Sequence, residues 1–120
     1  MISPEQVIAK LNEWRTCDYF AESRWEERGL IPSGAEVQKA LDTAKNSMVD
    51  GMLGAIKAKA DEEEMILLAL NHFRVCLDSR SFDTEESEFL ADCIAEVANS
   101  IELEDFYGRS EKLMMERHNL

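Results

Sequence analysis

Apolar residues return every three or four positions along most of the chain, which is the spacing of one face of an α-helix. The first helix is indicated by Ser3 as N-cap, Pro4 at the first helical position and Gln6 at the capping-box position. The pattern blurs after Cys17. The tripeptide Arg28-Gly29-Leu30 then has the order typical of a helix C-terminus, where glycine adopts a left-handed conformation. The buried face of the first helix is predicted to hold Val7, Leu11 and Trp14.

A second helix is predicted over residues 34–59. Ser33 is its expected N-cap, because Glu36 follows at the capping-box spacing. Gly51 and Gly54 fall inside the apolar pattern, and each costs about 1 kcal/mol relative to alanine in a helix interior. Two explanations remain open: the helix is bent or broken near Gly51, or another helix packs closely against it.

Three further helices complete the pattern. One starts near Asp61 and is apolar on more than one side, as a central helix would be. The next starts at Asp83, with Glu86 at the capping-box position, and its C-terminal end is left open. The last is expected over residues 110–115, after a break near Tyr107-Gly108. Because no strand pattern competes, we predict an all-α protein, a compact bundle of four to five helices.

The composition fits a globular domain and limits the classes of partner that it can bind. The chain has 120 residues, 45% hydrophobic and 32% charged, so a single helical domain over residues 1–120 is expected. A net charge of −12 argues against nucleic acid and membrane as partners, because polyanions and anionic membranes are bound by basic surfaces. The N-terminus lacks a secretion signal, the longest apolar run covers only residues 65–70, and the three cysteines are widely spaced. These features predict a cytoplasmic protein with reduced thiols.

Most of the net negative charge comes from one segment. Residues 81–108 contain nine carboxylates and neither lysine nor arginine, whereas the remaining chain has sixteen acids against thirteen bases. Asp83, Glu85 and Glu86 are explained by a helix N-terminus, where carboxylates cap free N–H groups and interact favourably with the helix dipole. Six carboxylates are left to explain: Glu88, Asp92, Glu96, Glu102, Glu104 and Asp105.

These six carboxylates differ in how strongly each one indicates a binding partner. Asp92 and Glu96 lie beyond the first helical turn with no base four residues later, so they are the firmest indication of a partner with a basic surface. Glu88 could belong either to the carboxylates explained by the helix start or to those that indicate a partner. Three others are unfavourable if the helix runs past Ile101 and favourable if a new helix starts there: Glu102, Glu104 and Asp105. The acidic face could instead be merely solvated, or neutralised by bases from other segments: Arg15, Arg24, Lys39 and Lys45.

The sequence contains no recognisable constellation for catalysis or metal binding. Glu88 and Asp92 could chelate a cation, but the Glu-x-x-His pairs of di-iron bundles and the loops of calcium sites are absent from the sequence. His72 precedes Cys76 by four residues on one helix side, where apolar neighbours favour packing over a nucleophile–base pair. We therefore predict no enzymatic activity, no metal and no cofactor.

The segment TEESEFLADCIAEVANSIELEDFYG, residues 84–108, resembles a family of short helical bacterial proteins described as a domain of unknown function. The resemblance extends back to Phe82 and Asp83, and the corner Arg28-Gly29-Leu30 is similar to the family's tight turn. Beyond Gly108 the chain departs from the pattern, having no tryptophan or tyrosine there. Because the family has no assigned activity, the resemblance implies a helical fold and no functional site. The positions that carry it are Thr84, Glu85, Glu88, Glu96, Ile101, Glu104 and Gly108.

The acidic segment favours a binding protein over an enzyme. The leading hypothesis is an immunity or antitoxin-type inhibitor, whose acidic helix face occupies the basic substrate cleft of a toxin enzyme in a bacterial cytosol. The carboxylates would steer and pair with the partner, and Phe106 or Tyr107 would anchor the contact. The alternative is a structural or homo-oligomerising helical module with no toxin partner, in which the acids only keep the protein in solution.

Overall fold

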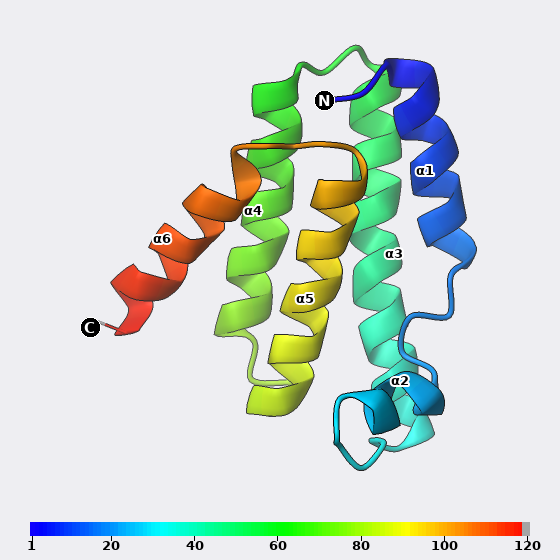
Figure 1. Cartoon of the computed structure of the whole chain (residues 1–120), viewed down its shortest axis with the longest axis vertical. Helices are drawn as coiled ribbons and strands as arrows, with labels where there is room; N and C mark the ends of the chain where they lie inside the picture. The colour runs from blue at the N-terminus through cyan, green and yellow to red at the C-terminus, as the bar shows by residue number, and fades with distance from the viewer. Residues whose placement is uncertain (119–120) are drawn as a thin grey trace.

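The computed structural model describes the backbone of residues 1–118 and the side chains as far as Glu116. This part of the chain forms six helices and no strand. Four long helices lie side by side, while the short α2 sits at one end of the bundle and α6 leans away from it (Figure 1). The predicted all-α bundle is confirmed, with one helix more than the four to five expected. The helices are α1 (Pro4–Thr16), α2 (Glu22–Glu27), α3 (Ala35–Lys57), α4 (Glu62–Asp78), α5 (Thr84–Ser100) and α6 (Phe106–His118).

The additional helix is α2, which lies where the apolar pattern blurs. Its N-cap, Ala21, has no side chain able to cap, so tertiary contacts must hold this six-residue helix in place. Trp25 is 1% exposed, and its indole N–H donates to the carbonyl of Phe20 at 3.0 Å. Gly29 has a φ of 73°, and the N–H of Leu30 donates to the carbonyl of Trp25 at 3.0 Å. The predicted glycine cap is therefore confirmed.

Two of the three predicted capping boxes form, and the helix expected to start near Asp61 begins with a side-chain cap. Ser3 and Asp83 each make a complete capping box, and Asp61 accepts a hydrogen bond from the backbone N–H of Glu64. The prediction for Ser33 is wrong, because α3 is capped by Gly34 and the Ser33 hydroxyl instead donates to Glu86 Oε2 at 2.6 Å. A tertiary hydrogen bond thus takes the hydroxyl that the local sequence assigns to a cap.

The helix α3 runs without interruption through both of its interior glycines. Of the two open explanations, a break near Gly51 is therefore wrong. A Cβ atom at Gly51 would lie 3.8 Å from Leu68 of α4, an ordinary van der Waals contact, and one at Gly54 would meet nothing within 4 Å. The neighbouring helix is thus close to Gly51, yet leaves room for alanine at either position.

The turn between α5 and α6 comes before Tyr107-Gly108, where the sequence analysis places the break. After Ser100, Glu102 takes a φ of 60°, and the N–H of Leu103 donates to the carbonyl of Ala98 at 3.0 Å. This is the hydrogen bond of a Schellman cap, with glutamate at the position that usually holds glycine. Because α6 begins at Phe106, the predicted break near Tyr107-Gly108 is wrong, and the predicted start at residue 110 is four residues late.

The core lies among the long helices, with α4 packed against α3, α5 and α6. An aromatic cluster closes the end of the bundle beside α2, and its rings meet edge-on or tilted at centroid distances of 4.8–5.9 Å. Its members are Trp14, Tyr19, Phe20, Trp25 and Phe89. None of the described helices has the length and apolar character needed to cross a bilayer.

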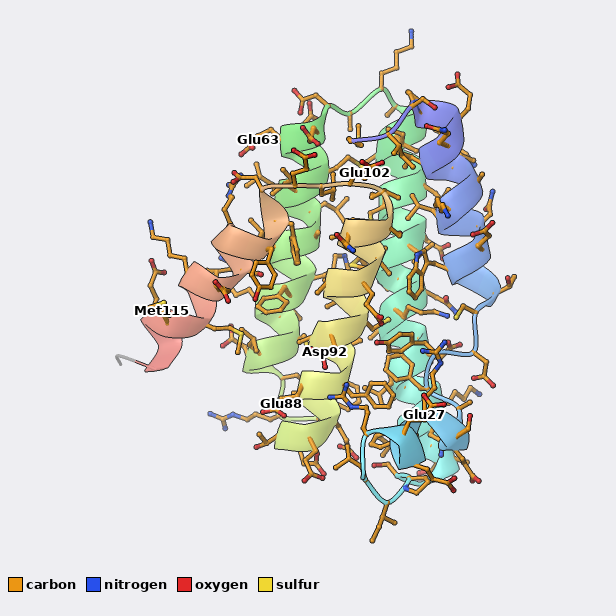
Figure 2. All side chains as sticks on the ribbon, viewed as in Figure 1. Glu27, Glu63, Glu88, Asp92, Glu102 and Met115 are labelled. Atoms are coloured by element: carbon orange, nitrogen blue, oxygen red, sulfur yellow. The ribbon has the colours of Figure 1, made fainter. Side chains whose placement is uncertain are left out.

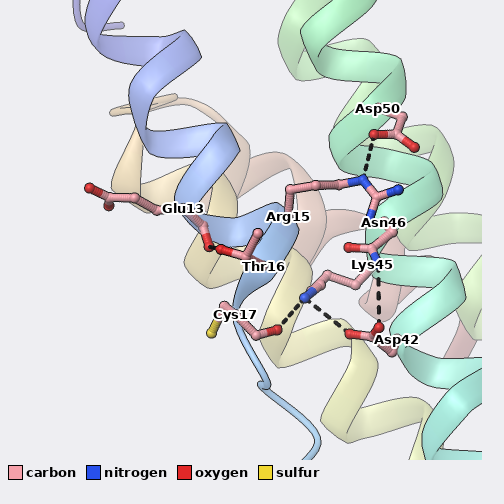
Figure 3. A network of polar contacts seen from close by, with 8 residues as sticks. All are labelled: Glu13, Arg15, Thr16, Cys17, Asp42, Lys45, Asn46 and Asp50. Carbon is pink, nitrogen blue, oxygen red and sulfur yellow. Dashed lines mark hydrogen bonds and ion pairs between the residues drawn. The ribbon is translucent and has the colours of Figure 1, made fainter.

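A buried lysine joins α3 to the chain after α1. Lys45 is 1% exposed, and its ammonium group donates to the carbonyl of Cys17 and pairs with Asp42 at 3.1 Å (Figure 3). Nearby, Arg15 Nε donates to Asp50 Oδ1 at 2.8 Å (Figure 3). Arg15 and Lys45, two of the bases expected to neutralise the acidic face, therefore pair with α3 carboxylates instead.

Candidate functional site

Two adjoining hollows lie along α5 and α6 and share Ala95 and Tyr107 in their linings. The first, which we call the loop hollow, has a volume of about 510 Å³ at the turn between the two helices. The second, the α5–α6 groove, has a volume of about 540 Å³ and extends toward the end of α4. Seven of the eight residues predicted to bind a partner line one or both: Glu88, Asp92, Glu96, Glu102, Glu104, Phe106 and Tyr107.

The linings of these hollows are acidic and contain no lysine or arginine among the residues with described side chains. Three carboxylates line the loop hollow: Glu96, Glu102 and Glu104. Four line the α5–α6 groove: Asp83, Glu88, Asp92 and Glu111. Figure 2 shows Glu88 and Asp92 along α5, and Glu102 beyond its C-terminal end. The structure therefore gathers seven carboxylates around one continuous surface.

Asp92 and Glu96 are not unpaired, contrary to the sequence-based expectation. Arg28 Nη1 donates to Asp92 Oδ2 at 2.7 Å, although the Asp92 side chain stays 57% exposed. Glu96 accepts a hydrogen bond from the Tyr19 hydroxyl, and burial together with this bond raises the pKa of Tyr19. The compensating groups come from the segment around α2, which local sequence spacing does not connect to α5.

Arg28 is the base that the sequence analysis missed. Its guanidinium lies 4.6 Å from the ring centre of Phe89 while it pairs with Asp92, so a cation–π contact holds the ion pair in place. Of the four bases expected here, only Arg24 approaches the site, lying 4.7 Å from the ring centre of Tyr19. Lys39 is exposed on α3.

Of the six carboxylates not explained by a helix start, Glu88, Glu102 and Glu104 make neither an ion pair nor a side-chain hydrogen bond with another described residue. All three are exposed. Asp105 lies outside both hollows, and among the described residues its carboxylate pairs only with Arg109 Nη1, at 3.8 Å. These three glutamates, rather than Asp92 and Glu96, are therefore the carboxylates most open to a partner.

The two candidate aromatic anchors have different environments. Phe106 is 2% exposed and packs edge-on against Phe73 at a centroid distance of 6.0 Å, so the prediction that it anchors a partner is wrong. Tyr107 is 67% exposed on the wall between the two hollows. Glu111 accepts a hydrogen bond from the Tyr107 hydroxyl, and this bond raises the pKa of that group. Of the two aromatic residues, Tyr107 is therefore the one whose ring is exposed.

Glu86 has a structural role that its helix-start position only partly explains. It is 8% exposed, and its Oε1 accepts the backbone N–H of Asp83 at 2.9 Å while its Oε2 accepts the Ser33 hydroxyl. Both carboxylate oxygens are thus occupied within the protein. Glu86 holds the start of α5 against the segment before α3 and is not available to a partner.

The thiols and the described histidine are placed for packing. The Cys76 thiol donates to the carbonyl of Ser87 at 3.3 Å, and burial raises its pKa to about 11. Burial also raises the pKa of Cys93 and lowers that of His72. No group of three His, Cys, Asp or Glu side chains able to hold a metal ion occurs among the described residues.

A third hollow lies on the opposite side of α6 and has the opposite charge. The α4–α6 hollow has a volume of about 440 Å³ and is lined by Arg74, Arg109 and Lys112, against the single acid Glu116. Arg109 makes two hydrogen bonds of 2.9 Å to the carboxylate of Glu63, and Arg74 donates to Asn71 at 2.9 Å. Two of its three bases thus already have partners within the protein.

The apolar part of the α5–α6 groove lining was not predicted. It includes Phe82 from the turn before α5, Met114 from α6, and Ala91 and Ala95 from α5. Ala91 and Ala95 are four residues apart, and this spacing indicates that they share one face of a helix. The fold is needed to show that this face borders a groove.

Comparisons with protein-family models, curated proteins and solved structures find no match to the chain. The resemblance of residues 84–108 to a family of unknown function therefore stays a prediction.

Proposed function

We propose that this chain is a protein-binding module that captures a partner with a basic surface, in the form of an immunity or antitoxin-type inhibitor of a toxin enzyme. One observation carries the proposal: seven carboxylates line two adjoining hollows whose described lining contains no lysine or arginine. Like charges gathered on one surface repel, and a partner with complementary charge offsets that cost and accelerates encounter.

The residues divide into steering and anchoring groups. Glu88, Glu102 and Glu104 are exposed and free of ion pairs within the described chain, so they present uncompensated charge to an approaching partner. Asp92 is still 57% exposed beside Arg28 and can accept a second base. Tyr107 supplies a large, exposed aromatic surface between the two hollows. A toxin whose substrate is nucleic acid or a nucleotide has a cationic cleft, which this surface would cover.

The test is the association rate with a candidate toxin domain encoded beside the gene. We expect the rate constant to fall steeply with ionic strength, and to fall further in the double variant Glu88→Lys/Glu104→Lys. The matched control is Glu13→Lys/Glu26→Lys, which reverses two exposed acids outside both hollows. An association rate constant that does not depend on ionic strength, or that changes equally in the two double variants, would rule out recognition through the hollows.

A homo-oligomerising module is the second candidate, and one observation favours it. Leu67 and Val75 are 50% and 58% exposed on α4, and Met115 of α6 is 65% exposed. Light scattering after size exclusion distinguishes the two functions. A dimer that persists in the Glu88→Lys/Glu104→Lys variant and dissociates in Leu67→Glu/Val75→Glu would support the oligomeric module.

A further inference from the structure

The α5–α6 groove combines an apolar floor with an acidic rim. Phe73, Leu77 and Phe82 supply the floor at the end of α4 and in the turn that follows. These side chains also pack against or belong to the hydrophobic core, so the floor is fixed by the fold. A rigid apolar surface under a charged rim is suited to an occupant that is itself apolar on one side and charged on its flanks.

The α5 wall of the groove is lined by small side chains. Ser87, Ala91 and Ala95 follow one another at intervals of four residues and all line the groove. Residues at this spacing share one helix face, and small side chains there allow a second helix backbone to approach within about 8–10 Å. The wall is therefore shaped for a neighbouring cylinder.

The opposite wall is α6, which is joined to the bundle mainly through its first half. Phe106 and Ser110 are buried, whereas Met114 is 38% exposed and lines the groove. Figure 1 shows α6 diverging from α5 toward its C-terminal end, so the two walls open outward. Methionine is an adaptable apolar contact, which allows this wall to accommodate different side chains.

The rim carries four carboxylates and, within the described lining, no base. Asp83, Glu88 and Asp92 follow the α5 side, and Glu111 stands on α6. Of these four, only Asp92 forms an ion pair with another described residue, Arg28, which lies outside the groove. An occupant with lysine or arginine on both flanks would meet carboxylates from both walls, and one with acidic flanks would be repelled.

We propose that the α5–α6 groove binds a basic amphipathic α-helix of the partner, with its apolar face on Phe82, Ala91 and Met114 and its basic flanks toward Glu88 and Glu111. This inference rests on the proposed function and specifies the form of the partner's binding element. A helix satisfies its own backbone hydrogen bonds, whereas an extended peptide needs a sheet edge, and the described chain has no strand to offer one.

Isothermal titration with two synthetic peptides tests the proposal. One is a Leu/Lys peptide of about 18 residues with apolar positions at helical spacing, and the other has the same composition in an order without that spacing. We expect the first to bind at least about tenfold more tightly, a difference of about 1.4 kcal/mol. Glu88→Gln should weaken binding by about two- to fivefold, while Glu85→Gln, on the same helix outside the groove, should not.

A groove-filling variant locates the binding. Ala95→Trp should remove the advantage of the helical peptide, whereas Ala9→Trp, at an exposed position of α1, should preserve it. Thermal unfolding of both variants shows whether either is misfolded, and Ala95→Arg repeats the test with a charged side chain if tryptophan disrupts the fold.

Equal binding of the two peptides would refute the proposal that the groove binds a helix, but it would not refute the proposed charge-based capture of a toxin. An advantage that survives in Ala95→Trp would place the peptide elsewhere and overturn the proposal as well. Absence of binding by both peptides also rejects the helical occupant, and the salt dependence of the association rate with the toxin domain then decides the proposed function separately.

Discussion

The left-handed backbone conformation of Glu102 should destabilise the folded protein. Its φ of 60° lies in the left-handed region, and Lys59 takes the same conformation at the end of α3 with a φ of 65°. Both residues belong to equivalent caps, because the N–H of Leu103 donates to Ala98 and that of Ala60 to Ala55, each at 3.0 Å. Replacing either residue by glycine should therefore relieve the same backbone strain.

The expected gains differ because the two side chains carry opposite charges. Relief of the left-handed conformation stabilises by about 1–2 kcal/mol, and the freedom of glycine in the unfolded chain offsets about 0.4–1 kcal/mol of it. At a helix C-terminus a carboxylate is unfavourable and an ammonium favourable, by about 0.3–1 kcal/mol each. The sum gives a gain in the free energy of unfolding of about 0.3–2.6 kcal/mol for Glu102→Gly, with a midpoint of about 1.5 kcal/mol, and a change of about −1.0 to 1.3 kcal/mol for Lys59→Gly, with a midpoint near zero.

Urea unfolding at low and high salt measures both gains. Salt should bring the two values together, because it screens the charge at the helix end and leaves the backbone strain unchanged. Glu102→Gln isolates the charge, since it keeps the positive φ. If Glu102→Gly destabilises the protein, or if its gain equals that of Lys59→Gly at low salt, the reasoning from strain and helix dipole is refuted. If the proposed function is correct, Glu102→Gly should also slow association with the partner, whereas Lys59→Gly should not.

Three further predictions follow from the described contacts. Burial lowers the pKa of His72 from its usual value near 6.5, so the unfolded chain binds a proton at this imidazole more readily than the folded chain. The free energy of unfolding should therefore fall as the pH drops below about 6.5. In urea titrations, His72→Gln should make the free energy of unfolding depend less on pH in this range. A double-mutant cycle of Arg28→Met and Asp92→Asn should give a coupling of about 0.5–1 kcal/mol, and a value of zero would mean that the pair is not formed in solution. Cys76 and Cys93 are buried, and burial raises the pKa of both, whereas Cys17 is partly exposed. In a Cys17→Ser variant, Ellman's reagent should therefore reach the two buried thiols only on unfolding, and fast labelling of the folded variant would contradict their placement.

Helix starts were the most predictable part of the fold, because their hydrogen bonds are local. Ser3 with Gln6 and Asp83 with Glu86 close boxes across three residues, and the structure contains both. Ser33 has the same local pattern and fails, because its hydroxyl reaches Glu86, fifty-three positions away. A tertiary competitor of this kind is not visible in the spacing of residues.

Helix ends were predictable only where glycine marks them. Gly29 was identified correctly, whereas the caps at Lys59 and Glu102 were missed because charged residues occupy the left-handed position. The error at Glu102 then moved the expected start of α6 beyond Tyr107. The same absence of a local signal concealed α2, which depends on the burial of Trp25 rather than on a cap of its own.

Charge counting singled out the segment whose carboxylates line the two hollows, but it did not predict which of these carboxylates are paired. Arg28 lies sixty-four positions from Asp92, and Tyr19 belongs to the segment between α1 and α2, so neither partner could be inferred from helix spacing. Phe106 follows three carboxylates within five positions, which suggested exposure, yet its ring completes the core against Phe73. Sequence thus indicated where charge gathers, and packing decides which charges are available.

The position of α6 makes it a partition between two compartments of opposite sign. One side of the helix, with Tyr107 and Glu111, borders the acidic groove, and the other, with Arg109 and Lys112, borders the basic hollow. A tilt that widened one compartment would narrow the other. A substitution that changed the tilt of α6 would therefore alter the acidic groove and the basic hollow together, in opposite senses.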